Sequence, residues 1–521
     1  MTHISTAVLL MTLGIVGTGY AQEADEAVRQ ATVERTSSRI KRLGDVEVMG
    51  SDKCAEGSKA EKPILPKQKK NVLFIAVDDL NDWVGCLRGH PQAQTPNIDR
   101  LAEKGVLFEQ AYCAAPLCNP SRTAIMTGLN PATTGIYCNE GWFRDIPRYE
   151  DRETIPQYFR KHGYMAWGGG KLYHMPDGKF SDPIAWDKRY STKMGTPFPP
   201  LEKRYQHGMH DKFSNKILQR LIDWGPIEQP TEETNDWRTA HLAAEFLQQE
   251  HDKPFFLGCG IFHPHLPWYV PKEYFDLHPL ETIQLPARKE NDLDDVPPIG
   301  RRMAETDFNI IREHGQWRNA VQGRLASCSF ADACVGHVLS VLEKSKYQDN
   351  TLVVLWGDHG YHLGEKDHFA KSALWEETSR TPLIIYAPGV SKSQGRCKRP
   401  VSLVDLYPTL IELCGLPERD DLDGHSLALL VRNPEAAWPY PAIITHSPIW
   451  HGTANHAIRT EQYHYIHYSD GGEELYDMSN DPKQWKNLAG DPEYSEIKEE
   501  LEEWLPKVNA EHFRPEAFGN W

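Results

Sequence analysis

Four apolar runs that each give way to glycine and ionisable residues constrain the fold of this chain most. The first, residues 71–77, is continuously apolar and rich in branched side chains, as in a central parallel strand covered on both faces. Similar runs occupy residues 164–167, 254–261 and 351–356. After the first run, residues 95–105 carry the N-cap, early proline and final glycine of a helix. This alternation predicts an α/β fold with a doubly wound sheet.

Ionisable side chains follow every one of these predicted strands. They are Asp78 and Asp79, Lys171 and His174, His263 and His265, and Asp358 and His359. Open α/β sheets bind ligands at the carboxyl ends of their strands, so we expect these side chains to share one pocket. Each pair taken alone is more often a helix cap or a turn, but four such pairs together with Cys118 favour a shared site.

A second informative stretch is residues 116–128, which contain Cys118 and Arg122. Pro120 suits the first position of a helix, which places Cys118 at the positive end of that helix. Such a site stabilises a thiolate or an anionic substrate. The alternative is a buried structural cysteine beside an ordinary helix start.

Composition narrows the class of protein. The 57 basic and 73 acidic residues give a formal net charge of -16, which disfavours nucleic acid or an anionic membrane as a partner. The 521 residues favour two domains of unequal size. The 10 cysteines show neither a disulfide framework nor the spacing of a zinc site.

The N-terminal region is expected to direct export. Residues 8–17 are apolar and small residues precede Gln22, which predicts a signal peptide over residues 1–21. Residues 22–70 are charged and predict a linker or loosely attached arm. Without another apolar run of about 18 residues, we expect no membrane span and a final location in the periplasm, the medium or a lysosome.

The carboxylates suggest a metal. Asp78, Asp79 and Asp358 offer hard oxygen ligands, which suit Ca²⁺ or Mg²⁺ better than a soft metal, and His359 adjoins them.

Several of these motifs together resemble one family. Cys118-x-Pro120-Ser121-Arg122 followed by Thr127-Gly128 resembles the signature of the type I sulfatases, in which the cysteine is oxidised to Cα-formylglycine. Residues 163–174, 262–267, 357–360 and 369–371 resemble further motifs of that family, and their order is most similar to its iduronate-2-sulfatase members. The resemblance implies an alkaline-phosphatase-like catalytic domain over residues 71–440 and a smaller α+β domain over residues 441–521.

The resemblance also implies roles for single residues. It assigns one Ca²⁺ ion to Asp78, Asp79, Asp358, His359 and the formylglycine derived from Cys118. It assigns the hydrated aldehyde to Arg122, the sulfate to Lys171, His174 and Lys371, and protonation of the leaving alcohol to His265. The implied reaction is removal of sulfate, such as the 2-O-sulfate of a uronic acid, from a sulfated polysaccharide or oligosaccharide, after maturation by a formylglycine-generating enzyme.

Two positions depart from the family pattern, namely Asn119 beside the cysteine and Ala166 in the second motif. Alternating stretches at residues 457–460, 463–468 and 474–477 predict a small antiparallel sheet, and residues 494–508 predict a helix packed on it. Tyr361, His362, Trp142 and Arg144 are candidate sugar contacts, with ordinary packing as the alternative.

Two other functions remain open from the sequence. A phosphodiesterase or phosphonate monoester hydrolase of the same superfamily would use a similar metal site. A non-catalytic protein that binds sulfated glycans would need the cationic side chains but neither the aldehyde nor a general acid.

Overall fold

The computed structural model describes residues 69–196, 199–200, 204–213, 216–304, 308–448 and 452–514. The predicted signal peptide and the predicted arm, except for its last two residues, lie outside this part of the chain.

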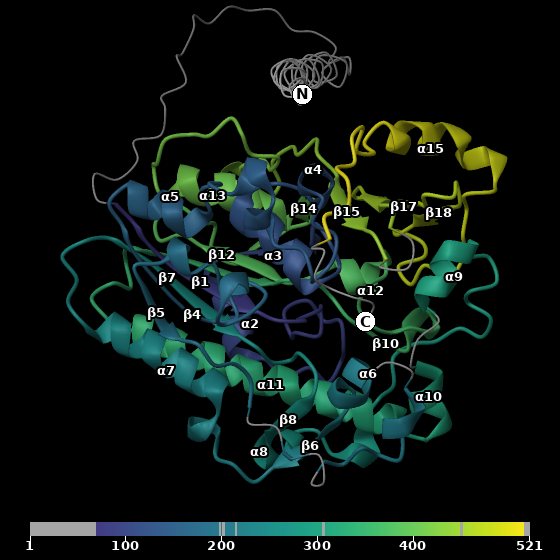
Figure 1. Cartoon of the computed structure of the whole chain (residues 1–521), viewed down its shortest axis with the longest axis horizontal. Coiled ribbons are helices and arrows are strands. Elements are labelled where there is room, and N and C mark those ends of the chain that lie inside the picture. Colours follow the sequence, from purple (N-terminus) through teal and green to yellow (C-terminus); the bar gives the residue numbers. More distant parts are fainter. Residues whose placement is uncertain are drawn as a thin grey trace, which may run out of the picture. The chain divides into compact units, whose positions relative to one another are not determined.

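An eight-stranded sheet forms the centre of the fold (Figure 1). In spatial order its strands are β13 (Gly395–Cys397), β2 (Val106–Phe108), β12 (Leu383–Tyr386), β9 (Thr351–Gly357), β1 (Asn71–Val77), β7 (Phe255–Ile261), β4 (Met165–Gly170) and β5 (Lys188–Ser191). The five strands from β9 to β5 are parallel, whereas β12 runs antiparallel to both of its neighbours. All four apolar runs that the sequence marks as strands are strands of this sheet.

Helices cover both faces of the sheet, as Figure 1 shows. One face carries α3 (Cys118–Thr127), α5 (Ile155–Lys161) and α13 (Leu406–Leu413), and the other carries α2 (Pro96–Lys104), α7 (Asn235–Gln248) and α11 (Trp317–Leu342). Successive residues of β1 alternate between two buried cores: Phe74 packs with α3 and α13, and Ile75 packs with α7 and α11. The doubly wound α/β fold is thus confirmed, and β1 is apolar throughout because both of its faces are covered.

Shorter elements surround the large sheet. They are the strand pairs β3 (Ala111–Tyr112) with β14 (Val401–Ser402), β6 (Trp224–Ile227) with β8 (Trp268–Pro271), and β10 (His362–Leu363) with β11 (Phe369–Ala370), and the helices α4 (Pro131–Thr134), α6 (Lys216–Leu221), α8 (Lys272–Asp276), α9 (Pro298–Ala304), α10 (Phe308–Glu313), α12 (Glu376–Ser379) and α14 (Ala428–Arg432).

Helix α11 is long and apolar enough to cross a membrane, but 78% of its most apolar window is buried against the rest of the protein. Helices of this kind form the cores of globular proteins as well as membrane spans.

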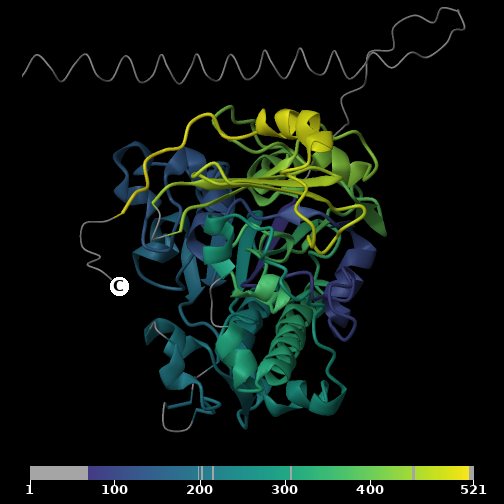
Figure 2. The same cartoon turned by 90° about the vertical axis from the view of Figure 1, so that its right-hand side faces the viewer.

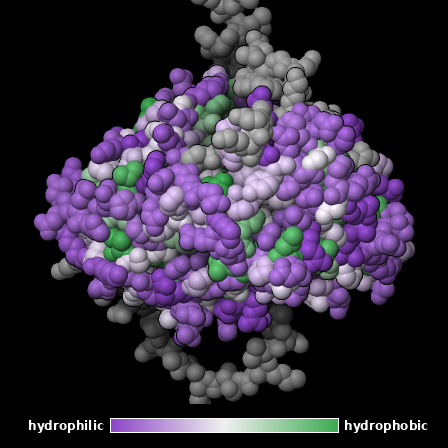
Figure 3. Space-filling view, turned by 90° about the horizontal axis from the view of Figure 1, so that it is seen from below, coloured by the Kyte–Doolittle hydropathy of each residue, from purple (hydrophilic) through white to green (hydrophobic). Residues whose placement is uncertain are grey.

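The face of the molecule in Figure 3 is covered mainly by hydrophilic residues, with hydrophobic ones scattered in small groups.

A second sheet, of four strands, follows these elements in the sequence. It consists of β15 (Ala442–His446), β16 (Asn455–Arg459), β17 (Tyr463–His467) and β18 (Glu473–Asp477), all antiparallel, and Figure 2 shows α15 (Ser495–Glu502) lying over it. The three predicted strands are present. The sequence did not mark β15, and α15 ends before the predicted residue 508. The other face of the sheet shares the core of the large sheet through residues such as Ile444 and Tyr476.

A buried ion pair joins this second sheet to the part of the chain that forms the large sheet. Arg459 of β16 donates to the carboxylate of Glu376 in α12 at 3.1 Å, and the hydroxyl of Tyr112 donates to the same carboxylate at 2.9 Å. Burial would raise the pKa of Glu376, but Arg459 holds it below its usual value. The pair therefore stays ionised in the interior.

Arg459→Ala is expected to destabilise the protein by about 3–5 kcal/mol, because it leaves a buried carboxylate without its charge partner. Arg399→Ala is the matched control, since Arg399 pairs at the surface with Glu461, which lies between β16 and β17, and should cost at most about 1 kcal/mol. Urea unfolding of both variants measures the difference. Equal losses of stability would contradict the role given to the buried pair.

Candidate active site

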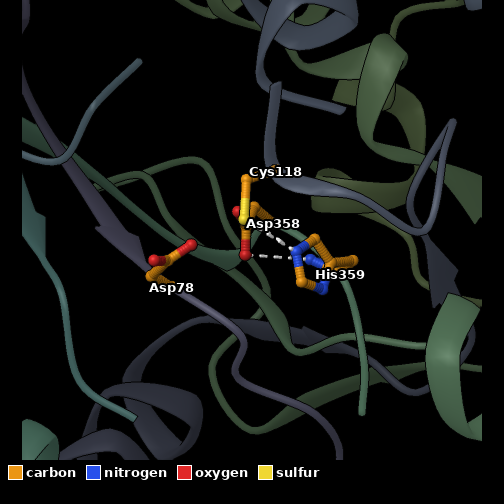
Figure 4. Close-up of side chains that lie close together, drawn as sticks. All are labelled: Asp78, Cys118, Asp358 and His359. Atoms are coloured by element: carbon orange, nitrogen blue, oxygen red, sulfur yellow. Dashed lines mark hydrogen bonds and ion pairs between the residues drawn. The ribbon is translucent and has the colours of Figure 1, made fainter. Parts of the chain in front are cut away.

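The ionisable residues that follow the predicted strands lie together, because β9, β1, β7 and β4 are neighbouring parallel strands whose carboxyl ends share one edge. The structure brings all ten predicted site residues to that edge: Asp78, Asp79, Lys171, His174, His265, Asp358 and His359 after the strands, Cys118 and Arg122 on α3, and Lys371 after β11. Figure 4 shows Cys118 above the carboxylates, with His359 beside it.

Helix α3 begins at Cys118, two residues before the start that Pro120 predicts. Leu117 caps the helix without a side-chain hydrogen bond, and the backbone N–H of Asn119 donates instead to the side chain of Asn139 at 3.0 Å. Cys118 itself is 1% exposed. The cysteine therefore lies inside the positive end of the helix, where an anionic group is favoured.

Arg122, one turn further along α3, joins three strand ends. Its Nε donates to Asp358 at 2.8 Å, its second terminal nitrogen donates to Asp78 at 3.0 Å, and its first donates to the backbone carbonyls of Lys171 and Leu172. The guanidinium is fully buried. A fixed planar donor of this kind suits several acceptors at once, which a lysine could not reach together.

Two ammonium groups flank the Cys118 sulfur. Nζ of Lys371 lies 3.1 Å and Nζ of Lys171 lies 3.8 Å from Sγ, and Nε2 of His359 lies at 3.3 Å. Burial alone would raise the pKa of the thiol, but Lys171, Lys371 and His359 hold it well below its usual value. This position therefore stabilises negative charge, as the helix start does.

Burial and neighbouring charges shift the pKa values of Asp78 and Asp358 in opposite directions. Burial raises the pKa of Asp358 to about 7 even though Arg122 lies beside it. Burial and the Cys118 thiolate favour a raised pKa at Asp78, but Lys171 and Arg122 bring that pKa below its usual value. Burial lowers the pKa of His359, yet the Asp358 carboxylate raises it to about 9.

The donor atoms fit a hard divalent cation. In two overlapping groups, Asp78, Cys118, Asp358 and His359, and Asp78, Asp79, Cys118 and His265, one ligand atom from each residue lies within 4.8 Å of the others. Three carboxylates converge there, and oxygen ligands of this kind are preferred by Ca²⁺ and Mg²⁺. The observed residues could therefore hold the cation that the carboxylate spacing predicts.

Three site residues are partly exposed and mark the side from which a substrate would enter. They are His174, His265 and Lys371. His174 also hydrogen-bonds to Cys118, and burial lowers its pKa. In contrast, His263 is fully buried and contacts Asp236 at 2.8 Å.

Sequence reasoning missed two buried residues that support the site. Arg324 of α11 donates to the backbone carbonyls of Asp79 and, at 2.9 Å, Pro264. Asp236 near the start of α7 holds the turn that carries His265. An arginine followed by the mostly apolar and small residues 325–331 is a signal that could have identified Arg324, since charged residues are rarely fully buried without a specific partner.

Three of the four candidate sugar contacts are buried, and the fourth is held in an ion pair. Trp142, Tyr361 and His362 are at most 3% exposed, and Arg144 is engaged with Asp182 at 2.6 Å. Packing, the alternative weighed for them, therefore accounts for the first three residues, and the ion pair with Asp182 accounts for Arg144.

The two departures from the family pattern have clear structural roles. The Asn119 side chain donates to the carbonyls of Cys138 and Gly141, and its backbone N–H donates to Asn139. Asn119 thus fastens the start of α3 to the loop at residues 138–141. Ala166 is fully buried in β4, where it adds a small side chain to the core.

Comparison with known proteins identifies the family. A sequence model described as Sulfatase matches residues 70–416, which is more than half of the chain. The chain belongs to the sulfatase family. A second model, described as N-sulphoglucosamine sulphohydrolase, C-terminal, matches residues 364–511. The protein is accordingly a hydrolase of sulfate esters by family, with the alkaline-phosphatase-like fold.

Individual relatives agree with this assignment. A protein from Formosa agariphila named Sulfatase is 40% identical over 460 residues, which is 85% of this chain and 87% of that protein. Iduronate 2-sulfatase from Mus musculus is 32% identical over 392 residues, 67% of this chain and 69% of the mouse protein. The fold is also similar to that of the phosphonate monoester hydrolase from Silicibacter pomeroyi, with a TM-score of 0.68, 22% identity and coverage of 84% and 94%.

Asp358→Asn is expected to abolish the thermal stabilisation of this sulfatase by Ca²⁺, because it removes one of three convergent carboxylates. A cation at about 100 times its Kd should stabilise the unchanged protein by about 2.7 kcal/mol. Thermal unfolding with CaCl₂ or with EGTA measures this gain. The control is Asp405→Asn, a buried carboxylate that accepts from the backbone N–H groups of Ser402 and His425 outside the site and should retain the gain. A full gain in Asp358→Asn would contradict the assigned metal site.

Proposed function

We propose that this sulfatase removes sulfate with Cα-formylglycine, formed from Cys118 by a maturation enzyme, at a Ca²⁺ site built from Asp78, Asp79, Asp358 and His359. The observation that carries the proposal is the position of the Cys118 side chain. It lies at the start of α3, beside two ammonium groups and close to the carboxylates of Asp78, Asp79 and Asp358. The hydrate of that aldehyde would supply two hydroxyl groups, one to attack sulfur and one whose loss of a proton would regenerate the aldehyde and release sulfate, which a thiol cannot do.

Other side chains of the site would bind the sulfate, donate the proton and position the nucleophile. Lys171 and Lys371 are placed to bind the sulfate oxygens and to stabilise charge that develops on them. His265, partly exposed at the entrance, donates a proton to the departing alcohol. Arg122 and His174 hold the nucleophile in place through their contacts around Cys118. Bound Ca²⁺ would neutralise and polarise the sulfate group.

We further propose that the substrate is the 2-O-sulfate of a uronic acid in a sulfated glycan such as a glycosaminoglycan. Two findings support this specificity: the order of the site motifs in the sequence and the similarity to iduronate 2-sulfatase over 67% of the chain. The predicted signal peptide supports export, which would bring the enzyme to such glycans in the periplasm, the medium or a lysosome.

One alternative rests on a specific observation. The fold is shared with a phosphonate monoester hydrolase, so a phosphonate or phosphate ester is a second candidate substrate. A glycan-binding protein without catalytic activity is a weaker candidate, because binding alone requires neither convergent metal ligands nor an acid beside the cysteine.

The substrate is tested by sulfate release from purified, matured protein. We expect a kcat/KM for a 2-O-sulfated uronic acid disaccharide at least about tenfold above that for a 6-O-sulfated glucosamine, since a site that hydrogen-bonds its substrate discriminates strongly. Phenyl phosphonate monoesters and phosphate diesters should be poorer still. Cys118→Ala is the inactive control. Preference for the glucosamine or the phosphonate would reject the proposed substrate while leaving the sulfatase family assignment intact.

A further inference from the structure

The turn that carries His265 is held by a carboxylate outside the proposed catalytic set. Asp236, in the first turn of α7, is fully buried. Its Oδ1 accepts from the backbone N–H of Gly195 at 2.8 Å and of Phe262 at 3.1 Å. Its Oδ2 accepts from the backbone N–H of His263 at 3.0 Å and from Nδ1 of the same residue at 2.8 Å. One side chain therefore satisfies four donors, three of which belong to the turn.

The His263 ring is part of this support. Because its partner at Nδ1 is a carboxylate, Nδ1 must carry the proton that is donated. The ring is fully buried and packs edge-on against Phe330 of α11. The ring therefore packs the turn against α11 and does not face the substrate.

The same turn fixes the orientation of His265. The backbone N–H of His265 donates to the carbonyl of Phe262 at 3.0 Å, and its Nδ1 lies 2.6 Å from the carbonyl oxygen of Leu266. A carbonyl can only accept, so Nδ1 is the protonated nitrogen in this contact. Nε2 is left as the nitrogen that can transfer a proton to the substrate, and a ring nitrogen lies within 4.8 Å of ligand atoms of Asp78, Asp79 and Cys118.

We propose that Asp236 is a positioning residue for proton donation by His265. This inference rests on the proposed role of His265 as the acid. Asp236→Asn would keep the shape of the side chain but replace one acceptor oxygen by an NH₂ group facing two N–H donors. The turn would then shift, and a displacement of about 1 Å at a reacting group costs about 100-fold in rate.

The test compares kcat for the sugar sulfate in Asp236→Asn, His265→Ala and the double variant. We expect Asp236→Asn to lower kcat about 10- to 100-fold with KM changed less than about twofold, since the acid acts only in the transition state. The double variant should be no slower than His265→Ala, because both changes remove the same step. An aryl sulfate with an acidic phenol, which departs without protonation, should show a smaller loss in both single variants.

Asp332→Asn is the matched control. Asp332 is also a buried carboxylate that accepts from backbone N–H groups, those of Asn97 at 3.1 Å and Ile98 at 2.8 Å, but it belongs to α11 and binds the start of α2. We expect its kcat to stay within about twofold of the unchanged enzyme. Peptide masses confirm equal maturation of Cys118 in every variant. If Asp236→Asn fails to fold, Asp236→Ser, which retains a smaller acceptor, takes its place in the same comparison.

The outcomes separate the two claims. Unchanged kcat in His265→Ala would overturn the proposed acid, and the positioning inference with it. A large loss in His265→Ala together with unchanged kcat in Asp236→Asn would overturn the inference alone. Losses that multiply in the double variant would do the same, because they would show that Asp236 acts on a different step.

Discussion

The contact on which the site depends is the buried guanidinium of Arg122 between Asp78 and Asp358. The two carboxylates follow neighbouring strands, and like charges brought together in the interior would repel each other. Arg122 offsets that repulsion and also binds the chain at the end of β4. Because Arg122 belongs to the helix that begins at Cys118, the same contact fixes the cysteine over the carboxylates. The same contact therefore both positions Cys118 and balances the charge of the two carboxylates.

This arrangement explains how an acidic protein can attract an anionic ester. The chain has a formal net charge of -16, yet Lys171 and Lys371 lie beside the Cys118 sulfur. Their ammonium groups also pair with Asp78 and Asp79. In the proposed mechanism the lysines serve two kinds of partner, the carboxylates of the protein and the oxygens of a substrate, and a divalent cation would supply further positive charge for both.

Much of the fold was predictable because buried parallel strands leave a strong signal in sequence. The apolar run at residues 71–77 indicates a strand that is covered on both faces. Because the carboxyl ends of parallel strands share one edge of a sheet, the residues that follow these strands were expected at that edge. The antiparallel β12 and the added β15 were not marked, since pairing direction depends on partners distant in the chain. Pro120 indicated a helix start correctly to within two residues, but the cap geometry at Leu117 decided the true start. Asp236 was missed because most of its partners are backbone groups of distant turns, which no local pattern records.

The most direct test of the account is the chemical state of Cys118 in protein that is actively releasing sulfate. The peptide containing Cys118 would be alkylated at free thiols, treated with a hydrazide and analysed by mass spectrometry, with sulfate release measured on the same preparation. The account predicts an aldehyde that reacts with the hydrazide and resists alkylation, in proportion to activity. A fully alkylated thiol in a preparation with high sulfatase activity would contradict it.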